Sequence, residues 1–140
     1  MSKLLEMLKR HEGVETHAYT DSVGKITIGV GRNIDPEGGL GLSPREINYL
    51  LQNDVDRVEN ELLGVIPWVE YIGWQRMDAL VNICFNLGLP RFLKFKKALA
   101  AAEDGNWDLC AEEFMDSRWA TQVGRRAIEL TELLKTGAYE

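Results

Sequence analysis

Hydrophobic residues at the start of the chain recur at the spacing of a helix. Leu4, Leu5 and Leu8 fall on one side of a helix drawn over residues 2–12. Gly13 stands where such a helix would end, because glycine readily adopts the backbone conformation of a helix C-terminus. This pattern predicts a short amphipathic helix that gives way to a different structure at the glycine.

Strict alternation replaces helical spacing in the next part of the chain. Residues 25–30 place three apolar side chains on one face of a strand and Thr27 on the other face. Residues 21–24 have the composition of a hairpin turn, and residues 33–39 have that of a loop. Together these segments predict a small antiparallel hairpin.

Helical spacing returns after residue 42. Ser43 can cap a helix, Pro44 suits its first position, and Glu46 completes a capping box. The helix that starts here should run to about Leu63. The segment near 74–87 is largely apolar and is predicted to be the central core helix. Further helices are expected near residues 91–103, 106–117 and 124–135.

These elements predict an α+β fold in one domain, residues 1–140, which is a length that buries most of its apolar surface. A small sheet lobe, about 13–42, is expected beside a larger helical lobe that contains about 1–12 and 43–140. The long helix from Ser43 joins the lobes, and a cleft is expected between them.

Charge and hydropathy exclude several functions. The formal net charge of −6 argues against nucleic acid as a partner, because phosphate binding depends on clustered Lys and Arg. No stretch approaches the roughly 18 apolar residues of a membrane span, so no stable membrane association is expected. The charged N-terminus has no apolar segment of the signal-peptide kind, so no secretory signal is expected.

The two cysteines, Cys84 and Cys110, lie in apolar helical patterns. This placement favours buried, reduced thiols, with a disulfide as the alternative. Neither cysteine has a Cys or His partner at metal-ligand spacing, so no metal site is predicted.

Two carboxylates and a hydroxyl in different surroundings are the candidate chemistry. Glu12 ends a helix, where the negative end of the dipole favours the neutral carboxyl. Asp21 opens a turn, where backbone N–H groups favour the ionised form, and Thr27 adds an uncharged group that can hold a water. Cleavage of a glycosidic bond needs such an acid and such a carboxylate. Each residue alone has an ordinary explanation in a helix end, a turn or a strand.

The stretch from Glu12 to Gly31, with Tyr19, Asp21, Gly24 and Thr27 between them, resembles the signature of the phage-type lysozymes, glycoside hydrolase family 24. Residues 82–88 are also similar to the family's core helix and its cleft-lining end, and residues 117–127 to the segment that closes the cleft. The resemblance therefore implies a lysozyme-like fold. In the signature, the matching positions are Glu12, Gly13, Tyr19, Asp21, Gly24, Thr27, Ile28, Gly29 and Gly31, in register without a gap.

The resemblance implies a role for each matching residue. Glu12 carries over as the general acid, and Asp21 as the carboxylate that activates water or stabilises positive charge on the sugar. Thr27 carries over as the hydroxyl that orients the water. The family inverts configuration, with carboxyls roughly 6.5–9.5 Å apart. The residues expected to bind substrate are Gly31, Arg32, Phe85, Asn86, Gln122 and Arg126.

Three of the residues expected to bind substrate differ in how specific their assignment is. Arg126 matches an arginine that lies beside the acid in the family. Phe85 is equally compatible with plain core packing. Arg32 stands where many relatives have histidine, so the family's histidine-centred ion pair cannot form; Arg32 could bind substrate carboxylates or an acidic neighbour instead.

The implied function is that of a muramidase acting on peptidoglycan, without metal or cofactor and as a monomer. It would cleave the β-1,4 bond between N-acetylmuramic acid and N-acetylglucosamine during phage-mediated host lysis. The enzyme would wait in the host cytoplasm until a separate membrane-permeabilising protein releases it to the periplasm and cell wall.

Two alternatives remain at this point. A lytic transglycosylase cuts the same bond without water, and would not need Asp21 and Thr27. A non-catalytic module that binds peptidoglycan would need none of the three residues, whereas the sequence retains all of them.

Overall fold

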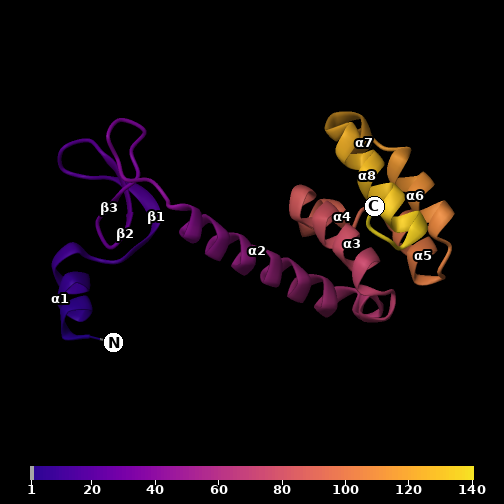
Figure 1. Ribbon diagram of the computed structural model, residues 1–140, viewed down its shortest axis with the longest axis horizontal. Coiled ribbons are helices and arrows are strands. Elements are labelled where there is room, and N and C mark those ends of the chain that lie inside the picture. Colours follow the sequence, from indigo (N-terminus) through magenta and orange to yellow (C-terminus); the bar gives the residue numbers. More distant parts are fainter. Residues whose placement is uncertain (1) are drawn as a thin grey trace. The chain divides into compact units, whose positions relative to one another are not determined.

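The computed structural model describes residues 2–140, which fold as two compact units (Figure 1). The first unit extends to Leu50, and the second runs from Leu51 to Glu140. The chain passes from one unit to the other along helix α2 (Pro44–Val65). Many helices with one small antiparallel sheet confirm the predicted α+β fold class. The assignment of residues 1–12 to a helical lobe stays a prediction.

Helix α1 (Lys3–Glu12) opens the first unit; it begins one residue after the predicted start and ends at the predicted residue. The Ser2 hydroxyl accepts a hydrogen bond from the backbone N–H of Leu5 at 3.2 Å, which satisfies one of the free donors of the first turn. Gly13 follows Glu12 with a φ of 80°, and its N–H donates to the Lys9 carbonyl at 2.9 Å. The glycine thus makes Glu12 the last helical residue.

The sheet contains three antiparallel strands in the order β1-β2-β3: β1 (Glu15–Thr20), β2 (Ile26–Gly29) and β3 (Arg32–Asn33). The predicted hairpin of β1 and β2 is confirmed, with Tyr19 opposite Thr27. The prediction of a loop from residue 33 was wrong by one residue, because the two-residue strand β3 is too short to produce an alternating pattern. On β2 the buried side chain is Thr27, whereas Ile26 is exposed.

Helix α2 begins with the predicted capping box. The Ser43 hydroxyl accepts from the Glu46 N–H at 3.2 Å, and a Glu46 carboxylate oxygen accepts from the Ser43 N–H at 2.9 Å. The helix extends to Val65, two residues beyond the predicted end.

The second unit is helical throughout. The core helix predicted over 74–87 is confirmed as α3, with six buried side chains. The helix predicted over 91–103 is two helices, because Phe95 has a non-helical backbone (φ −78°, ψ 58°). No described helix is long and apolar enough to cross a bilayer. In order, the elements are η1 (Pro67–Tyr71), α3 (Trp74–Leu87), α4 (Leu89–Phe92), α5 (Lys96–Glu103), α6 (Trp107–Met115), α7 (Arg118–Val123) and α8 (Arg125–Thr136).

Phe114, on α6, is at the centre of the core of the second unit. It is completely buried, and its ring lies 6.3 Å from that of Phe92, 5.0 Å from Phe95 and 6.1 Å from Trp119. These rings come from α4, α7 and the segment before α5, so one side chain joins four elements. Figure 1 shows α5, α6 and α8 gathered in this unit, where α6 packs against both of the others.

Arg76, on α3, anchors the end of α8. Its Nε donates to the Leu134 carbonyl at 2.7 Å, and a terminal nitrogen donates to the Lys135 carbonyl at 2.9 Å. The last carbonyls of a helix have no partner within the helix, so Arg76 satisfies two of them. The same guanidinium lies 4.7 Å from the ring centre of Trp107, which ties α3 and α8 to α6.

Both cysteines are free and buried, which confirms the reduced-thiol interpretation. Removal from water raises the pKa of the Cys84 thiol to about 11, with a smaller contribution from the Glu61 carboxylate. Burial likewise raises the pKa of Cys110 to about 12. Both groups are therefore protonated at neutral pH.

Replacing Phe114 with alanine should lower the free energy of unfolding by about 3–5 kcal/mol, because a fully buried ring leaves a cavity. The neighbouring Met115 is 42% exposed, so Met115→Ala should cost about 0.5 kcal/mol or less. Urea unfolding followed by circular dichroism measures both values. Equal losses in the two variants would contradict the central position of Phe114.

Neither thiol should react with a soluble disulfide reagent in the native protein at pH 8. The thiolate is the reactive form, and burial both keeps the thiols protonated and shields them. Both should react once guanidinium chloride unfolds the chain. The absorbance of the chromophore that the reagent releases gives the number of thiols that have reacted. Rapid reaction of one thiol in the folded protein would show that its helix opens readily.

Candidate active site

The backbone of Lys25 holds Asp21 and Thr27 in place within the first unit. Asp21 Oδ1 accepts from the backbone N–H groups of Val23 at 3.0 Å and Lys25 at 2.8 Å. Thr27 Oγ1 donates to the Lys25 carbonyl at 3.0 Å, and this carbonyl also accepts from the Asp21 N–H at 2.9 Å. The predicted carboxylate and hydroxyl are thus fixed to the same residue of the hairpin.

These bonds leave specific atoms available for chemistry. Asp21 Oδ2 has no hydrogen-bond partner among residues 2–140, and two backbone donors hold the other oxygen. Thr27 uses its proton on the Lys25 carbonyl, so toward any further group its oxygen acts as an acceptor. Asp21 Oδ2 can therefore accept a proton or a hydrogen bond, and Thr27 Oγ1 can accept a hydrogen bond.

The Glu12 carboxyl packs against the backbone of Gly31. A Cβ atom on residue 31 would lie 2.8 Å from Glu12 Oε2 and 3.1 Å from Cδ, so any side chain there would displace the end of the Glu12 side chain. Gly31 also has a φ of 67°, in the left-handed region that favours glycine. The structure thus brings together Glu12 and Gly31, two of the residues that the sequence singled out.

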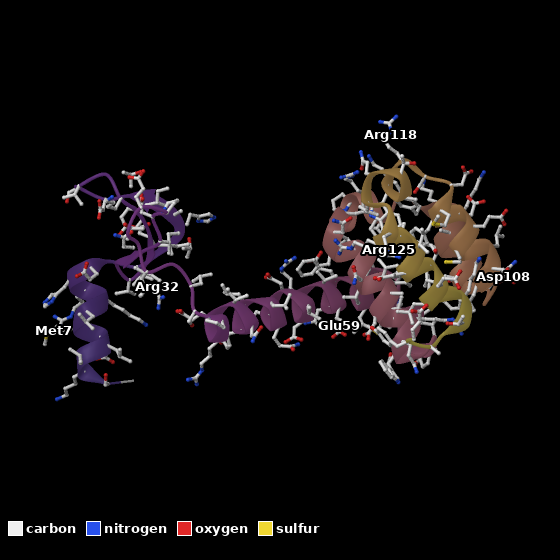
Figure 2. The ribbon with its side chains drawn as sticks, turned by 45° about the horizontal axis from the view of Figure 1, so that its top comes forward. Met7, Arg32, Glu59, Asp108, Arg118 and Arg125 are labelled. Carbon is white, nitrogen blue, oxygen red and sulfur yellow. The ribbon has the colours of Figure 1, made fainter. Side chains whose placement is uncertain are left out.

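Arg32 binds an acidic neighbour, one of the two roles considered for it. One terminal nitrogen donates to Glu46 Oε1 and to the Gly41 carbonyl, both at 3.0 Å, and the other lies 2.6 Å from Glu46 Oε2. The Ser43 N–H, then the Ser43 hydroxyl, and more weakly Arg32 hold the pKa of Glu46 below its usual range. Figure 2 labels Arg32 within the first unit.

Arg126 and Asn86 lie in the second unit and are held by polar neighbours. The Arg126 guanidinium donates to Asn82 Oδ1 at 2.6 and 3.1 Å and to the Asn82 carbonyl at 3.3 Å. Asn86, one turn further along α3, accepts from the indole N–H of Trp119 at 2.8 Å. The expected position of Arg126 beside the acid stays a prediction.

Phe85 and Arg126 line one hollow of about 350 Å³ in the second unit, together with Asn82 and Tyr139. Phe85 is 41% exposed and lies outside the buried core, which favours surface contact over core packing for this ring. Gln122 is exposed on α7 and makes no side-chain hydrogen bond within the described chain. The substrate-binding roles themselves stay predictions.

A metal centre has no support in the part of the chain that the structure describes. Residues 2–140 contain no group of three or more His, Cys, Asp or Glu side chains arranged to hold an ion. The donor atoms at the candidate site are two carboxyls, a hydroxyl and backbone groups, which suit proton transfer and hydrogen bonding.

The sequence profile of the phage lysozyme family matches residues 9–135, which include every candidate residue named above. The chain belongs to this family. The predicted resemblance to the phage-type lysozymes is therefore confirmed, and membership makes the protein a glycosidase of the lysozyme type.

Individual relatives agree with this assignment. The chain is 30% identical to a probable T4-type lysozyme of Dictyostelium discoideum, covering 98% of this chain and 96% of that protein. It is 27% identical to the pre-baseplate central spike protein Gp5 of Enterobacteria phage T4, where the match covers 98% of this chain but 28% of the spike protein. An endolysin of Salmonella phage P22 is 32% identical over 61% of this chain and 60% of its own length.

Three residues that hold candidate residues within their own unit were not anticipated from the sequence. Asn82 holds Arg126, Glu46 holds Arg32, and the Lys25 backbone holds Asp21 and Thr27. Asn82 had a recognisable signal, since it is polar on an apolar helix one turn before Asn86. The sequence indicated helix capping alone for Glu46. The hydrogen bonds of the Lys25 backbone do not depend on which side chain stands at that position, so the sequence could not indicate them.

Gly31→Ala should lower the rate of cell-wall lysis roughly 10- to 100-fold, because the new Cβ displaces the Glu12 carboxyl. Gly29→Ala is the matched control: its φ of 69° is nearly the same, but a Cβ there meets nothing within 4 Å. Both variants should lose about 1–2 kcal/mol of stability from the backbone conformation. Lysis is followed by turbidity and stability by urea; equal losses of activity would contradict the specific contact with Glu12.

Proposed function

We propose that the protein is a muramidase that hydrolyses the β-1,4 bond between N-acetylmuramic acid and N-acetylglucosamine in peptidoglycan. Family membership supports a lysozyme that lyses peptidoglycan. The observation that carries the finer proposal is the attachment of Asp21 and Thr27 to the same residue, Lys25, with acceptor atoms free on both.

Glu12 is the general acid in this proposal. Its carboxyl ends α1 and is exposed, with no hydrogen-bond or ion-pair partner among residues 2–140. It donates its proton to the glycosidic oxygen as the bond to the anomeric carbon breaks, so the departing sugar leaves as a neutral alcohol. The carboxyl lies in space that stays open because residue 31 has no side chain.

Asp21 and Thr27 together orient the attacking water. Thr27 accepts one water hydrogen bond, since its own proton is engaged by the Lys25 carbonyl. Asp21 Oδ2 accepts the other hydrogen and takes that proton as the water oxygen bonds to the anomeric carbon. Attack from the face opposite the departing sugar inverts the configuration, and this requires carboxyls roughly 6.5–9.5 Å apart.

The biological setting that fits this activity is phage-mediated host lysis. The enzyme would remain in the host cytoplasm until a separate membrane-permeabilising protein gives it access to the periplasm and the wall, where it acts as a monomer. The endolysin of phage P22 among its relatives favours this setting.

The lytic transglycosylase is the competing reaction, and one observation counts against it. In that reaction a hydroxyl of the substrate replaces water, so no water needs to be oriented. The ordered hydrogen bonds of Asp21 and Thr27 would then have no catalytic purpose.

Glu12→Gln should abolish lysis of chloroform-permeabilised Gram-negative cells and digestion of purified peptidoglycan, because the amide has no proton to donate. The wild type should release ordinary reducing ends, whose initial anomer is inverted by NMR. Glu15→Gln changes an exposed carboxylate three residues away and should leave the rate unchanged. Anhydro ends would assign the protein to the transglycosylases, and wall binding without cleavage would make it a binding module.

A further inference from the structure

The Arg32–Glu46 pair is the best-shielded ion pair of the described chain. The guanidinium uses two nitrogens on the two oxygens of one carboxylate, which is the strong bidentate form of this interaction. The Arg32 and Glu46 side chains retain 32% and 36% of their exposure, whereas Arg57 and Glu61 retain 61% and 33%, so only the first pair is shielded on both sides. Shielding and the bidentate geometry distinguish this pair from ordinary surface pairs, which contribute little.

Each partner of the pair is itself fixed to an element. Arg32 belongs to β3 and lies opposite Ile28 in the sheet. Glu46 lies in the first turn of α2, where its carboxylate also accepts from the Ser43 N–H. A third bond from Arg32 reaches the Gly41 carbonyl, in the loop between the two elements. Arg32 therefore clamps the strand, the loop and the helix start to one another.

The residue before Arg32 is Gly31, which carries the contact with the Glu12 carboxyl. The turn that contains it has no buried side chain of its own, since both Val30 and Gly31 are exposed. Its position consequently depends on the strands on either side, and β3 is only two residues long. The bonds from Arg32 to Glu46 and Gly41 therefore hold β3, and with it the turn that contains Gly31, more firmly than two strand residues could alone.

We infer that Arg32 is a positioning residue, which holds Gly31 against the carboxyl of Glu12 by clamping β3 to the first turn of α2 through Glu46. The inference rests on the catalytic role proposed above for Glu12. It gives Arg32 a task inside the protein in place of substrate binding, because two of its guanidinium nitrogens are already engaged.

Two substitutions break the clamp from opposite sides. Arg32→Lys keeps the charge but cannot bridge both oxygens of Glu46 and the Gly41 carbonyl. Glu46→Gln removes the charge and one acceptor, yet a glutamine still serves the capping box with Ser43. Each variant should lower kcat by up to about 100-fold through displacement of the acid and leave KM nearly unchanged. The double variant should have a kcat no lower than that of the less active single variant, because both substitutions break the same interaction.

Glu61→Gln is the matched control, because it breaks the pair with the exposed Arg57 on the same helix and should change neither kcat nor KM. A substrate-binding role for Arg32 gives a different result: Arg32→Lys would raise KM, and Glu46→Gln would leave kcat intact. That outcome overturns the proposal, as does full activity in all variants.

NMR relaxation of the Gly31 N–H tests the clamp without relying on activity. Its order parameter should fall in Arg32→Lys and Glu46→Gln and remain at the wild-type value in Glu61→Gln. If the wild type proved inactive but the order parameter still fell in the two variants, the clamp would be supported and only the proposed function would be wrong. An unchanged order parameter would overturn the clamp itself.

Discussion

The Glu12 carboxyl occupies the space that a side chain on residue 31 would need, and this contact joins the end of α1 to the turn before β3. Helix α1 ends on Glu12 because Gly13 stops it there, which presents the carboxyl at the helix terminus. The turn on the other side of the contact is narrow because Gly31 adopts a positive φ. The contact leaves the Glu12 carboxyl beside Gly31 without a hydrogen bond to it among residues 2–140, which suits the acid role proposed for it.

Local patterns in the sequence were sufficient for most of the fold. The capping box at Ser43, the apolar helix over residues 74–87 and the hairpin that contains Thr27 depend on neighbouring residues, and all three are confirmed. The predictions failed where tertiary packing determines the backbone conformation. Phe95 leaves the helical conformation while its ring packs on Phe114, and no periodicity within residues 91–103 could indicate that.

The sequence was sufficient to name the candidate residues, but it did not indicate the contacts that hold them in place. The resemblance to the phage lysozymes singled out Glu12, Asp21 and Thr27, and the family is confirmed. The supporting contacts join positions distant in sequence or use the backbone, as with Arg126 on Asn82 and Thr27 on the Lys25 carbonyl. Such contacts depend on three-dimensional placement, which side-chain identity does not record.

The anchoring of α8 by Arg76 has a consequence for how the protein is made. The guanidinium on α3 binds carbonyls of Leu134 and Lys135, some sixty positions later in the chain. Because Leu133 and Leu134 also belong to the core, the second unit cannot close until α8 has left the ribosome. During synthesis the second unit therefore exposes its apolar surface to chaperones until the last helix is complete.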